Sequence, residues 1–585
     1  MTITRKLQDA VQLHQAGNLA DAGKLYQEIL QEDPDQVDAL NLLGVVLSVA
    51  GKFDAAITLL QRACELAPDF AGPFVNLGNV LQAMGRLEEA VDAFQKGLTL
   101  APEQAETANN LASALNALGR HEEALTSCTS ALTHDPNLAA AHINMGNALL
   151  ALGNAEEAVV SYEKALQLNP ADSTAHFDLG NAQMELAEFE AAFGSYTKAV
   201  ALDFSNAEKH YNLGNAAEAL DRYEEAIASY EKALEIQPGY VDALCNRGAT
   251  LQKMDQLDDA ISVLRAALEA EPDSPDLHWN LSLALLQNGD YEEGWAEYEW
   301  RWQTPTFMDF VRDFGVPRWQ GEPLEGRTLL IDAEQGFGDA IQFIRYARLA
   351  VQQGGAVVVE CRPGLNRLFS AIEGVEQCVD LGAELPPFDV YCPLMSLPHV
   401  MGTTMETVPA EIPYLSAPDG ARPDPRIAAA PDLKVGIAWA GSPTRVDNHK
   451  RSCPLPALQP LWETEGVTLF SLQVGSFEKD IDDLPADHGI INLADGLADF
   501  GDTAAAVEAL DLVISVDTSV LHLAGALGKP AWGLMSRPTG FLWQTERTDS
   551  PWYPTIKLYR QPEPGDWASL IAAVAADLSI LARSD

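Results

Sequence analysis

Apolar residues in the first half of the chain follow a pattern that repeats every 34 residues. Each unit contains two stretches in which apolar residues return at helical spacing, with a short turn between them. A glycine ends the first helix, an alanine lets the helices approach closely, and a proline stops the second helix. Proline stands at 34, 68, 102, 136, 170, 238 and 272, glycine at 17, 51, 85, 119, 153 and 289, and alanine at 22, 56, 90, 124, 158, 192, 226 and 260. The pattern predicts nine helix pairs up to about residue 303.

This unit resembles the tetratricopeptide repeat (TPR), and the resemblance covers about half of the chain. In such repeats each helix pair buries its apolar face only against its neighbours, so the pairs stack into a superhelix with a concave groove. We therefore expect an all-α TPR superhelix over residues 1–303.

An amide side chain recurs at the sixth position of successive units. The row consists of Asn76, Asn110, Asn144, Asn212, Asn246 and Asn280, with Asp178 in the remaining place. Asparagine inside a helix costs roughly 0.7 kcal/mol relative to alanine, and its amide can pair with any peptide backbone. The row resembles the asparagine ladder with which O-GlcNAc transferase holds acceptor polypeptides. We interpret it as a site for an extended protein acceptor; the alternative is that each asparagine only bonds to the neighbouring repeat.

From about Trp319 the pattern changes to short apolar runs that alternate with helical stretches. The runs are RTLLIDA (327–333), AVVVECR (356–362), FDVYC (388–392), KVGIAWA (434–440), VTLFSLQ (467–473), DLVISVD (511–517) and PAWGLM (530–535). Continuous apolar runs are typical of parallel strands that are buried on both faces. We predict two Rossmann-like lobes, as in the GT-B glycosyltransferases, with a cleft between the carboxyl ends of their strands.

The predicted boundaries follow these changes in pattern. A connector over 304–325 joins the repeats to a first lobe at 326–416, on the acceptor side. The stretch at 417–432, rich in Pro, Asp and Ala, is an interdomain linker. A second lobe at 433–585 follows on the donor side.

Two loops carry most of the chemical information. In the first loop, Gly336 and Gly338 precede Asp339 and a predicted helix, so a carboxylate stands at a helix N-terminus; helix capping is the alternative role. The second loop follows DLVISVD and contains Asp517, Thr518, Ser519, Val520 and His522. Its helix begins with unpaired N–H groups, which can accept a phosphate, and His522 lies one turn inside. A core histidine is the alternative for His522.

A basic segment, GSPTRVDNHKRS (441–452), follows the strand at 434–440 and places Lys450 and Arg451 in an acidic lobe. The alternative is a solvated surface pair. The pattern Asp480-Ile-Asp482 is a weak metal motif in a chain this rich in Asp.

Together these motifs resemble the heptosyltransferase-like family 9 glycosyltransferases over most of 325–560. TPRs joined to such a half resemble bacterial protein glycosyltransferases, including those that modify flagellin. The resemblance implies that Asp339 is the catalytic base and that Lys450 or Arg451, Asp517–Val520 and His522 bind a nucleotide-sugar donor. It implies O-glycosylation of Ser or Thr with no metal and no further cofactor. Departures from the family pattern, such as Asp-Thr-Ser for Asp-Thr-Gly at 517–519, leave the donor open. We have no role for the Ser-Pro-Trp-Tyr-Pro segment at 550–554.

Composition narrows the partners and the location. The chain of 585 residues holds 85 acidic and 37 basic residues, a net charge of −48, which disfavours binding to nucleic acid and to anionic lipid. Residues 1–303 hold 47 acidic and 17 basic residues, so a neutral or basic partner segment is expected. Seven cysteines without a Cys-x-x-Cys pair, no apolar signal core and no membrane-spanning run predict a cytoplasmic protein without membrane insertion.

Two other functions stay open at this point. One is a heptosyltransferase that acts on lipopolysaccharide. The other is a non-catalytic TPR scaffold with a degenerate GT-B half.

Overall fold

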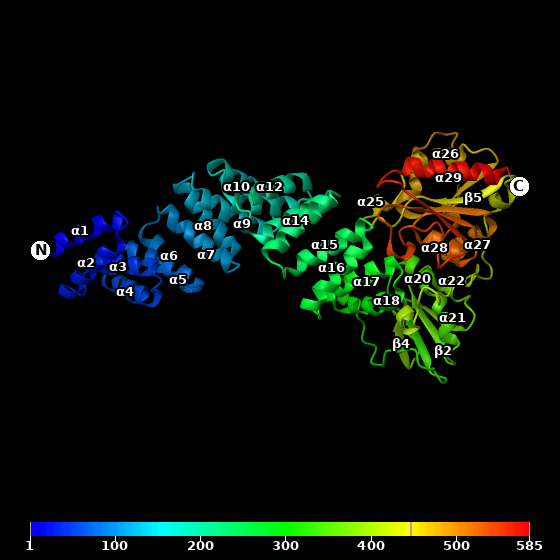
Figure 1. Ribbon diagram of the computed structural model, residues 1–585, viewed down its shortest axis with the longest axis horizontal. Helices are drawn as coiled ribbons and strands as arrows, with labels where there is room; N and C mark the ends of the chain where they lie inside the picture. The colour runs from blue at the N-terminus through cyan, green and yellow to red at the C-terminus, as the bar shows by residue number, and fades with distance from the viewer. Residues whose placement is uncertain (1, 445–446, 584–585) are drawn as a thin grey trace. The chain divides into compact units, whose positions relative to one another are not determined.

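The computed structural model of the chain describes residues 2–444 and 447–583. It divides into two compact units, Met1–Tyr240 and Val241–Asp585 (Figure 1). We call them the first unit and the second unit.

The first unit consists of antiparallel helix pairs. Its helices are α1 (Ile3–Gln15), α2 (Leu19–Glu32), α3 (Val37–Val49), α4 (Phe53–Leu66), α5 (Ala71–Ala83), α6 (Leu87–Leu100), α7 (Ala105–Ala117), α8 (His121–His134), α9 (Ala139–Ala151), α10 (Ala155–Leu168), α11 (Ser173–Glu185), α12 (Phe189–Leu202), α13 (Ala207–Ala219) and α14 (Tyr223–Ile236). Each helix packs on the next along the chain. The glycines of the 34-residue step follow the first helix of each pair with positive φ, as at Gly119 (72°).

A second row of glycines explains how tightly the pairs pack. A Cβ on Gly146, Gly180 or Gly214 would lie 2.6, 2.6 or 2.4 Å from the nearest ring atom of the tyrosine sixteen residues later. Those rings, from Tyr162, Tyr196 and Tyr230, are almost completely buried. The absent side chain therefore lets an aromatic ring lie directly on the neighbouring helix backbone.

The second unit begins with two further helix pairs, which complete the nine predicted pairs within the described residues. They are α15 (Val241–Lys253), α16 (Leu257–Ala270), α17 (Pro275–Asn288) and α18 (Tyr291–Tyr298), followed by the 3₁₀ helix η1 (Glu299–Gln303). Thus the helical superhelix spans the first 300 residues or so, as predicted, but its last two pairs belong to the same compact unit as the α/β half.

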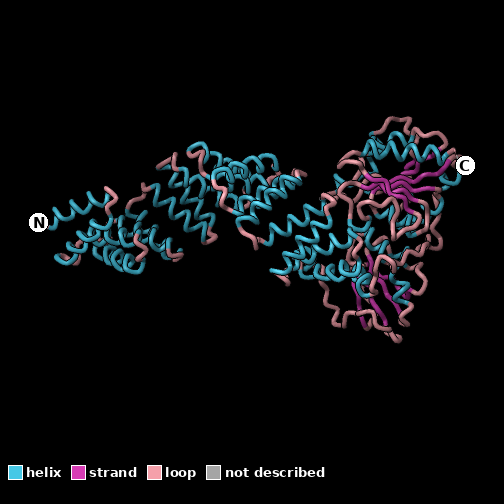
Figure 2. The backbone as a smooth tube through the Cα atoms, in the orientation of Figure 1, coloured by secondary structure: helices cyan, strands magenta, loops and turns pink. Residues whose placement is uncertain are grey.

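The α/β half contains two fully parallel sheets, shown as two groups of magenta strands in Figure 2. The first lobe has the order β3-β2-β1-β4 and the second lobe the order β10-β9-β8-β5-β6-β7. The strands are β1 (Thr328–Asp332), β2 (Ala356–Cys361), β3 (Val375–Asp380), β4 (Val390–Pro393), β5 (Leu433–Ala438), β6 (Val467–Ser471), β7 (Ile491–Asn492), β8 (Leu512–Val516), β9 (Ala531–Met535) and β10 (Ile556–Arg560). All seven predicted strands are present, and β3, β7 and β10 were not predicted. Read from β7, the second sheet has the 3-2-1-4-5-6 order of a Rossmann fold.

Helices cover the sheets and fill the connections. They are α19 (Pro305–Met308), α20 (Phe337–Phe343), α21 (Arg345–Val351), α22 (Asn366–Phe369), α23 (Leu397–Val400), α24 (Pro425–Ala429), α25 (Asn448–Arg451), α26 (Gln459–Trp462), α27 (Phe500–Ala509), α28 (Ser519–Ala526) and α29 (Trp567–Ala582). Helices α26 and α29 pack on one face of the second sheet, while α27 and α28 cover the other (Figure 1).

One continuous hydrophobic core joins the last repeat to both lobes. It runs from Trp295 of α18 through Phe343 of α20 to Leu521 of α28 and Trp552. The indole of Trp295 meets the ring of Phe343 edge-on at 5.6 Å, and Phe541 of the second lobe lies 6.3 Å away. The terminal repeat therefore shares its hydrophobic core with the α/β half.

The connector and the linker also belong to the packed structure. In the connector, Trp319 is completely buried. Its backbone N–H donates to the carbonyl of Tyr391, which extends the edge of the first sheet beyond β4. Just before the linker, Tyr414 donates its N–H to the carbonyl of Ala526 in α28. The first bond holds the connector to the first sheet, and the second bond ties the end of the first lobe to α28 of the second lobe.

Candidate functional site

The candidate residues lie where strand order reverses in each sheet. The first loop leaves β1, which stands between β2 and β4, and the second loop leaves β8, which stands beside β5. The basic segment leaves β5 itself. In open parallel sheets this switch point, at the carboxyl ends of the strands, is where ligands bind.

The structure brings the first and second loops together. Helices α20 and α28, which the two loops begin, pack against each other. A Cβ on Gly338 would lie 3.1 Å from Cδ2 of His522 and 3.8 Å from Cα of Ser519. Gly338 thus lets the two helix N-termini approach closely, since a Cβ at this position would press against the ring of His522.

Asp339 lies in the first turn of α20, whose N-cap is Gly336. Its Oδ2 is 3.3 Å from the place that a Cβ on Gly336 would take, so the carboxylate turns back toward the start of the helix. The pKa of Arg451, in the second lobe, is raised mainly by Asp517, and the negative charge of Asp339 adds to this effect. The position therefore suits both capping and a role toward a ligand between the lobes.

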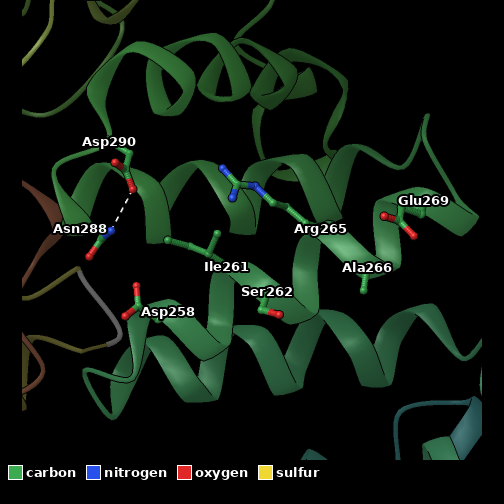
Figure 3. A pocket seen from close by; sticks show the side chains of 8 residues that line it. All are labelled: Asp258, Ile261, Ser262, Arg265, Ala266, Glu269, Asn288 and Asp290. Atoms are coloured by element: carbon green, nitrogen blue, oxygen red, sulfur yellow. Dashed lines mark hydrogen bonds between the residues drawn. The ribbon is translucent and has the colours of Figure 1, made fainter.

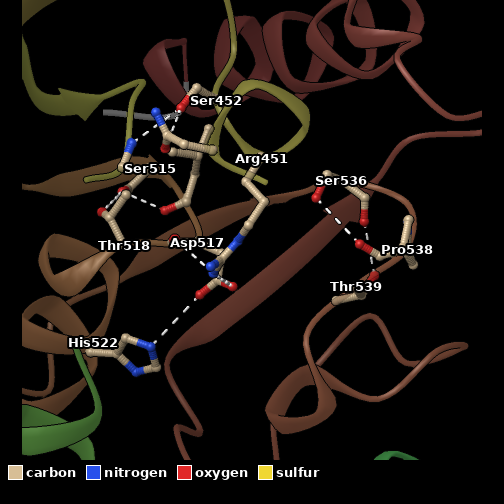
Figure 4. Close-up of polar contacts among 12 residues, drawn as sticks. Arg451, Ser452, Ser515, Asp517, Thr518, His522, Ser536, Pro538 and Thr539 are labelled. Atoms are coloured by element: carbon tan, nitrogen blue, oxygen red, sulfur yellow. Dashed lines mark hydrogen bonds and ion pairs between the residues drawn. The ribbon is translucent and has the colours of Figure 1, made fainter. Parts of the chain in front are cut away.

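Arg451 and Asp517 form an ion pair at the carboxyl edge of the second sheet (Figure 4). The guanidinium also donates to the backbone carbonyl of Asp517 at 3.2 Å. Burial alone would raise the pKa of Asp517, but Arg451, aided by His522 and Trp543, outweighs it and holds that pKa far below its usual value. Asp517 is therefore charged at neutral pH, and it neutralises Arg451.

His522 is 4% exposed, and both ring nitrogens face protein groups. Nδ1 lies 3.1 Å from the hydroxyl of Tyr553, and Nε2 lies 3.7 Å from Oδ1 of Asp517. The indole of Trp543 stands 5.1 Å from the imidazole. His522 is thus a buried histidine that supports Asp517.

The other predicted donor-binding residues surround this pair. Thr518 is the N-cap of α28, and its hydroxyl lies 3.1 Å from that of Ser515. The N–H groups of Ser519 and Val520 belong to the first turn and have no acceptor within the helix. Lys450 lies on α25, next to Arg451. Arg445 and Val446 of the basic segment lie outside the described residues.

Several residues of this site gave no recognisable signal in the sequence. Ser452 accepts the N–H of Gly441 at 3.2 Å and donates to Asn448 at 3.0 Å, which closes the basic segment on itself. Tyr553 comes from the segment at 550–554 that had no assigned role. Trp543 and Tyr553 touch the site only through tertiary packing, which local patterns do not report.

Asp480, of the weak Asp-x-Asp pattern, accepts a hydrogen bond from the indole of Trp439 at 3.0 Å. Among the described residues, no group of three or more His, Cys, Asp or Glu side chains is placed to share a metal ion. All seven cysteines are free thiols.

The first three members of the asparagine row bond to the neighbouring repeat, whereas Asn212 accepts from Asn215 of its own helix at 3.4 Å. Asn76 donates to Asn41 at 2.8 Å, Asn110 to Asn79 at 3.0 Å, and Asn144 to Asn109 at 2.8 Å. In the second unit, Asn280 bonds to the thiol of Cys245. Every member of the row is still partly exposed. The alternative interpretation, bonding between repeats, therefore holds for these pairs. The side chains nevertheless stay partly exposed at the surface.

Replacing Asp178 with the asparagine that the row predicts should stabilise the first unit. Burial, with help from Asp172, raises the pKa of Asp178 to about 6, above the value of 3.8 for a free side chain. The folded state therefore disfavours the charged form, and this cost disappears as the pH falls below 6. We expect Asp178→Asn to raise the free energy of unfolding by about 2–3 kcal/mol at pH 8 and by little at pH 4.

Urea denaturation followed by far-UV circular dichroism measures this difference. The first unit contains no tryptophan, so tryptophan fluorescence, which reports the second unit, should not change. Asp92→Asn, at an exposed position of α6, is the matched control. An equal gain at both pH values would contradict a raised pKa of Asp178 in the folded state.

A surface pocket of about 460 Å³ lies elsewhere in the second unit, between α16 and the turn before α18 (Figure 3). Asp258, Glu269 and Asp290 line it together with Arg265, which pairs with Glu293. None of the predicted site residues lines this pocket.

Sequence profiles identify the helical pairs as tetratricopeptide repeats. They match residues 13–72, 70–134, 115–160, 146–187, 207–240 and 245–299. The helical half of the chain therefore consists of TPRs and is followed by a parallel α/β half, and a TPR surface suits binding of a protein partner. No helix among the described residues combines the length and the apolar character that crossing a bilayer requires.

One relative is Protein FlbA of Caulobacter vibrioides, which is 28% identical over 336 residues. The alignment spans 52% of this chain and 55% of FlbA, so it covers about half of each protein.

Solved TPR structures resemble the helical part. The hetero-tetramer Cut9-Hcn1 of the APC/C is 20% identical, with 46% of this chain and 52% of that chain covered and a TM-score of 0.35. YrrB, described as a TPR protein with an unusual peptide-binding site, is 24% identical, with 32% and 95% covered and a TM-score of 0.28. These scores lie below 0.5, and the TPR assignment depends on the profiles and on the helices themselves.

Proposed function

We propose that this protein is a glycosyltransferase that moves a sugar from a nucleotide sugar to a Ser or Thr hydroxyl of a protein docked on the TPRs. The observation that carries the proposal is the meeting of the first and second loops at the switch points of two parallel sheets. Gly338 lies against His522 and Ser519, so the carboxylate of Asp339 and the N-terminus of α28 border the same space.

In this proposal Asp339 is the general base. The acceptor hydroxyl gives its proton to the carboxylate while its oxygen forms a bond to the anomeric carbon of the sugar. The bond from that carbon to the phosphate oxygen breaks, and its electron pair leaves with the nucleoside diphosphate. General base assistance of this kind accelerates the reaction by about 10²–10⁴-fold.

The second lobe would stabilise the leaving phosphate. The N–H groups of Ser519 and Val520 and the positive end of the α28 dipole point to the carboxyl edge of the sheet. The guanidinium of Arg451 adds rigid N–H donors, although its Nη2 already donates to Asp517, which also balances its charge. Lys450, on the same short helix, supplies a further cation. The reaction is proposed to need no metal ion and no cofactor beyond the nucleotide sugar.

The repeats would hold the acceptor. Partly exposed amides at the sixth position can pair with an extended backbone of any sequence, and the acidic first half favours a neutral or basic segment. Flagellin is the first acceptor to test, because TPR proteins with a family 9-like half resemble flagellin-modifying enzymes.

Labelled nucleotide sugars, incubated with the purified protein and a cell extract, test this proposal. We expect label in one polypeptide, on Ser or Thr, identified by mass spectrometry. Label in lipopolysaccharide would instead support a heptosyltransferase. Absence of label with every donor, while the protein still captures a partner through its repeats, would support a non-catalytic scaffold. The location is proposed to be the cytoplasm, where nucleotide sugars are made.

A further inference from the structure

The segment at 550–554 connects the last repeat to the donor side of the site. Trp552 and Tyr553 are adjacent, and both are buried. Because neighbouring side chains point in different directions, one residue faces the repeat and the other faces α28.

On the repeat side, the indole N–H of Trp552 donates to the hydroxyl of Tyr291 at 3.1 Å. Tyr291 is the first residue of α18, in the terminal repeat. The two rings lie 5.8 Å apart, and Trp552 also meets Phe343 of α20 edge-on at 5.4 Å. This indole therefore touches both the repeat and the helix that carries Asp339.

On the donor side, Tyr553 lies directly on α28. A Cβ on Gly525 would be 2.4 Å from its ring, so the glycine makes the contact possible. The Tyr553 hydroxyl is 3.1 Å from Nδ1 of His522 and 3.3 Å from the hydroxyl of Tyr414. The buried guanidinium of Arg345 lies 4.6 Å from the centre of the Tyr553 ring and donates to the Tyr414 hydroxyl at 3.0 Å.

The direction of the hydrogen bond to His522 follows from the charge of Asp517. Nε2 of His522 faces the carboxylate of Asp517, so the tautomer with its proton on Nε2 is favoured, and in that tautomer Nδ1 is the acceptor. The hydroxyl of Tyr553 then donates to Nδ1. Burial raises the pKa of Tyr553 well above its usual value, so that hydroxyl keeps its proton.

We propose that Tyr553 is a positioning residue for the donor site and that Trp552 couples it to the terminal repeat. Tyr553 fixes the tautomer and the orientation of His522. The imidazole of His522 faces one carboxylate oxygen of Asp517 at 3.7 Å, and Asp517 aims the guanidinium of Arg451 at the donor phosphate. The last of these steps, from Asp517 through Arg451 to the donor phosphate, rests on the proposed function. The steps from Tyr553 to Asp517 do not.

Tyr553→Phe removes one hydroxyl and keeps the ring that packs on Gly525. We expect its affinity for the nucleoside diphosphate to fall about five- to tenfold, the loss typical of one buried hydrogen bond. Isothermal titration with UDP, GDP, ADP, CDP and dTDP on the full chain first finds the diphosphate that the wild type binds. Tyr291→Phe, which removes the acceptor of Trp552, should weaken the same affinity about two- to threefold. Tyr559→Phe, which loses a bond to Asp577 at the far side of the second lobe, should leave it unchanged.

The tautomer of His522 supplies a readout that does not need a nucleotide. Long-range ¹H–¹⁵N spectra of the imidazole rings, with the His522 signal assigned from His522→Gln, should show protonated Nε2 in the wild type and a mixture of tautomers in Tyr553→Phe. An unchanged tautomer in Tyr553→Phe would overturn the positioning role. If the tautomer shifts but the wild type binds no diphosphate, the proposed function is wrong while the link from Tyr553 to His522 stands. If it shifts and Tyr553→Phe binds as tightly as the wild type, the positioning role is wrong.

Discussion

Replacing Asp339 with asparagine is expected to lower the rate of sugar transfer by about 10²–10⁴-fold while the affinity for nucleotide stays within about twofold. Asparagine keeps the shape of the side chain and its ability to cap the start of α20, but it cannot accept the proton of the acceptor hydroxyl. The capping role and the base role of Asp339 therefore separate in this variant. Transfer is measured from labelled donor to the acceptor polypeptide, and nucleotide affinity by titration.

The matched control is Asp276→Asn, which makes the same change in the first turn of α17 at an exposed position. It should transfer sugar at the wild-type rate. If Asp339→Asn keeps more than about a tenth of the wild-type rate, Asp339 is not the base. A loss of transfer that comes with a lowered melting temperature would instead indicate that its contribution is structural.

Replacing Arg451 with methionine should destabilise the second unit by about 3 kcal/mol at pH 7, because it leaves the carboxylate of Asp517 buried without its partner. In the wild type the pKa of Asp517 lies below that of the unfolded chain, so its contribution is lost only as the pH falls below about 4. In the variant burial dominates, so the pKa of Asp517 should rise above that of the unfolded chain. The variant should then recover stability as the pH is lowered from 7 toward 5.

Urea denaturation followed by tryptophan fluorescence measures this effect, since all 11 tryptophans lie in the second unit. Arg367→Met is the control: Arg367 pairs with Asp499 and Asp502, but its side chain is 42% exposed, and such surface pairs contribute about 1 kcal/mol or less. A loss for Arg451→Met that matches the control and does not change with pH would show that the ion pair with Asp517 contributes little.

The repeats and the central strands were predictable because each carries its own local signal. Glycine and proline at a fixed step define the helix pairs. Runs such as Leu512–Val516 are apolar except at Ser515 and buried at every position, because both faces of the strand are covered. The strand Val375–Asp380 stands at an edge, and its polar residues Glu376 and Gln377 are exposed, so it has no such run. The strand Ile491–Asn492 is too short to form a pattern at all.

The site was predictable in its loops but not in its pairings. A strand followed by a polar turn and a helix marks Asp339 and the stretch 517–522 in the sequence itself. The ion pair of Arg451 with Asp517 joins residues 66 positions apart, and the contact of His522 with Tyr553 joins residues 31 positions apart. Such pairings depend on which strands become neighbours, and no local pattern encodes that order.

The continuous core around Trp295 sets the smallest piece of this chain that can be inherited or expressed on its own. A fragment that starts at residue 304 would leave Phe343, Phe541 and Trp552 without the aromatic rings that cover them, and it should aggregate. A fragment that starts at Val241 keeps those rings. A junction placed before Val241 leaves the second unit whole, so the upstream repeats can be exchanged for others without changing the packing around Trp295.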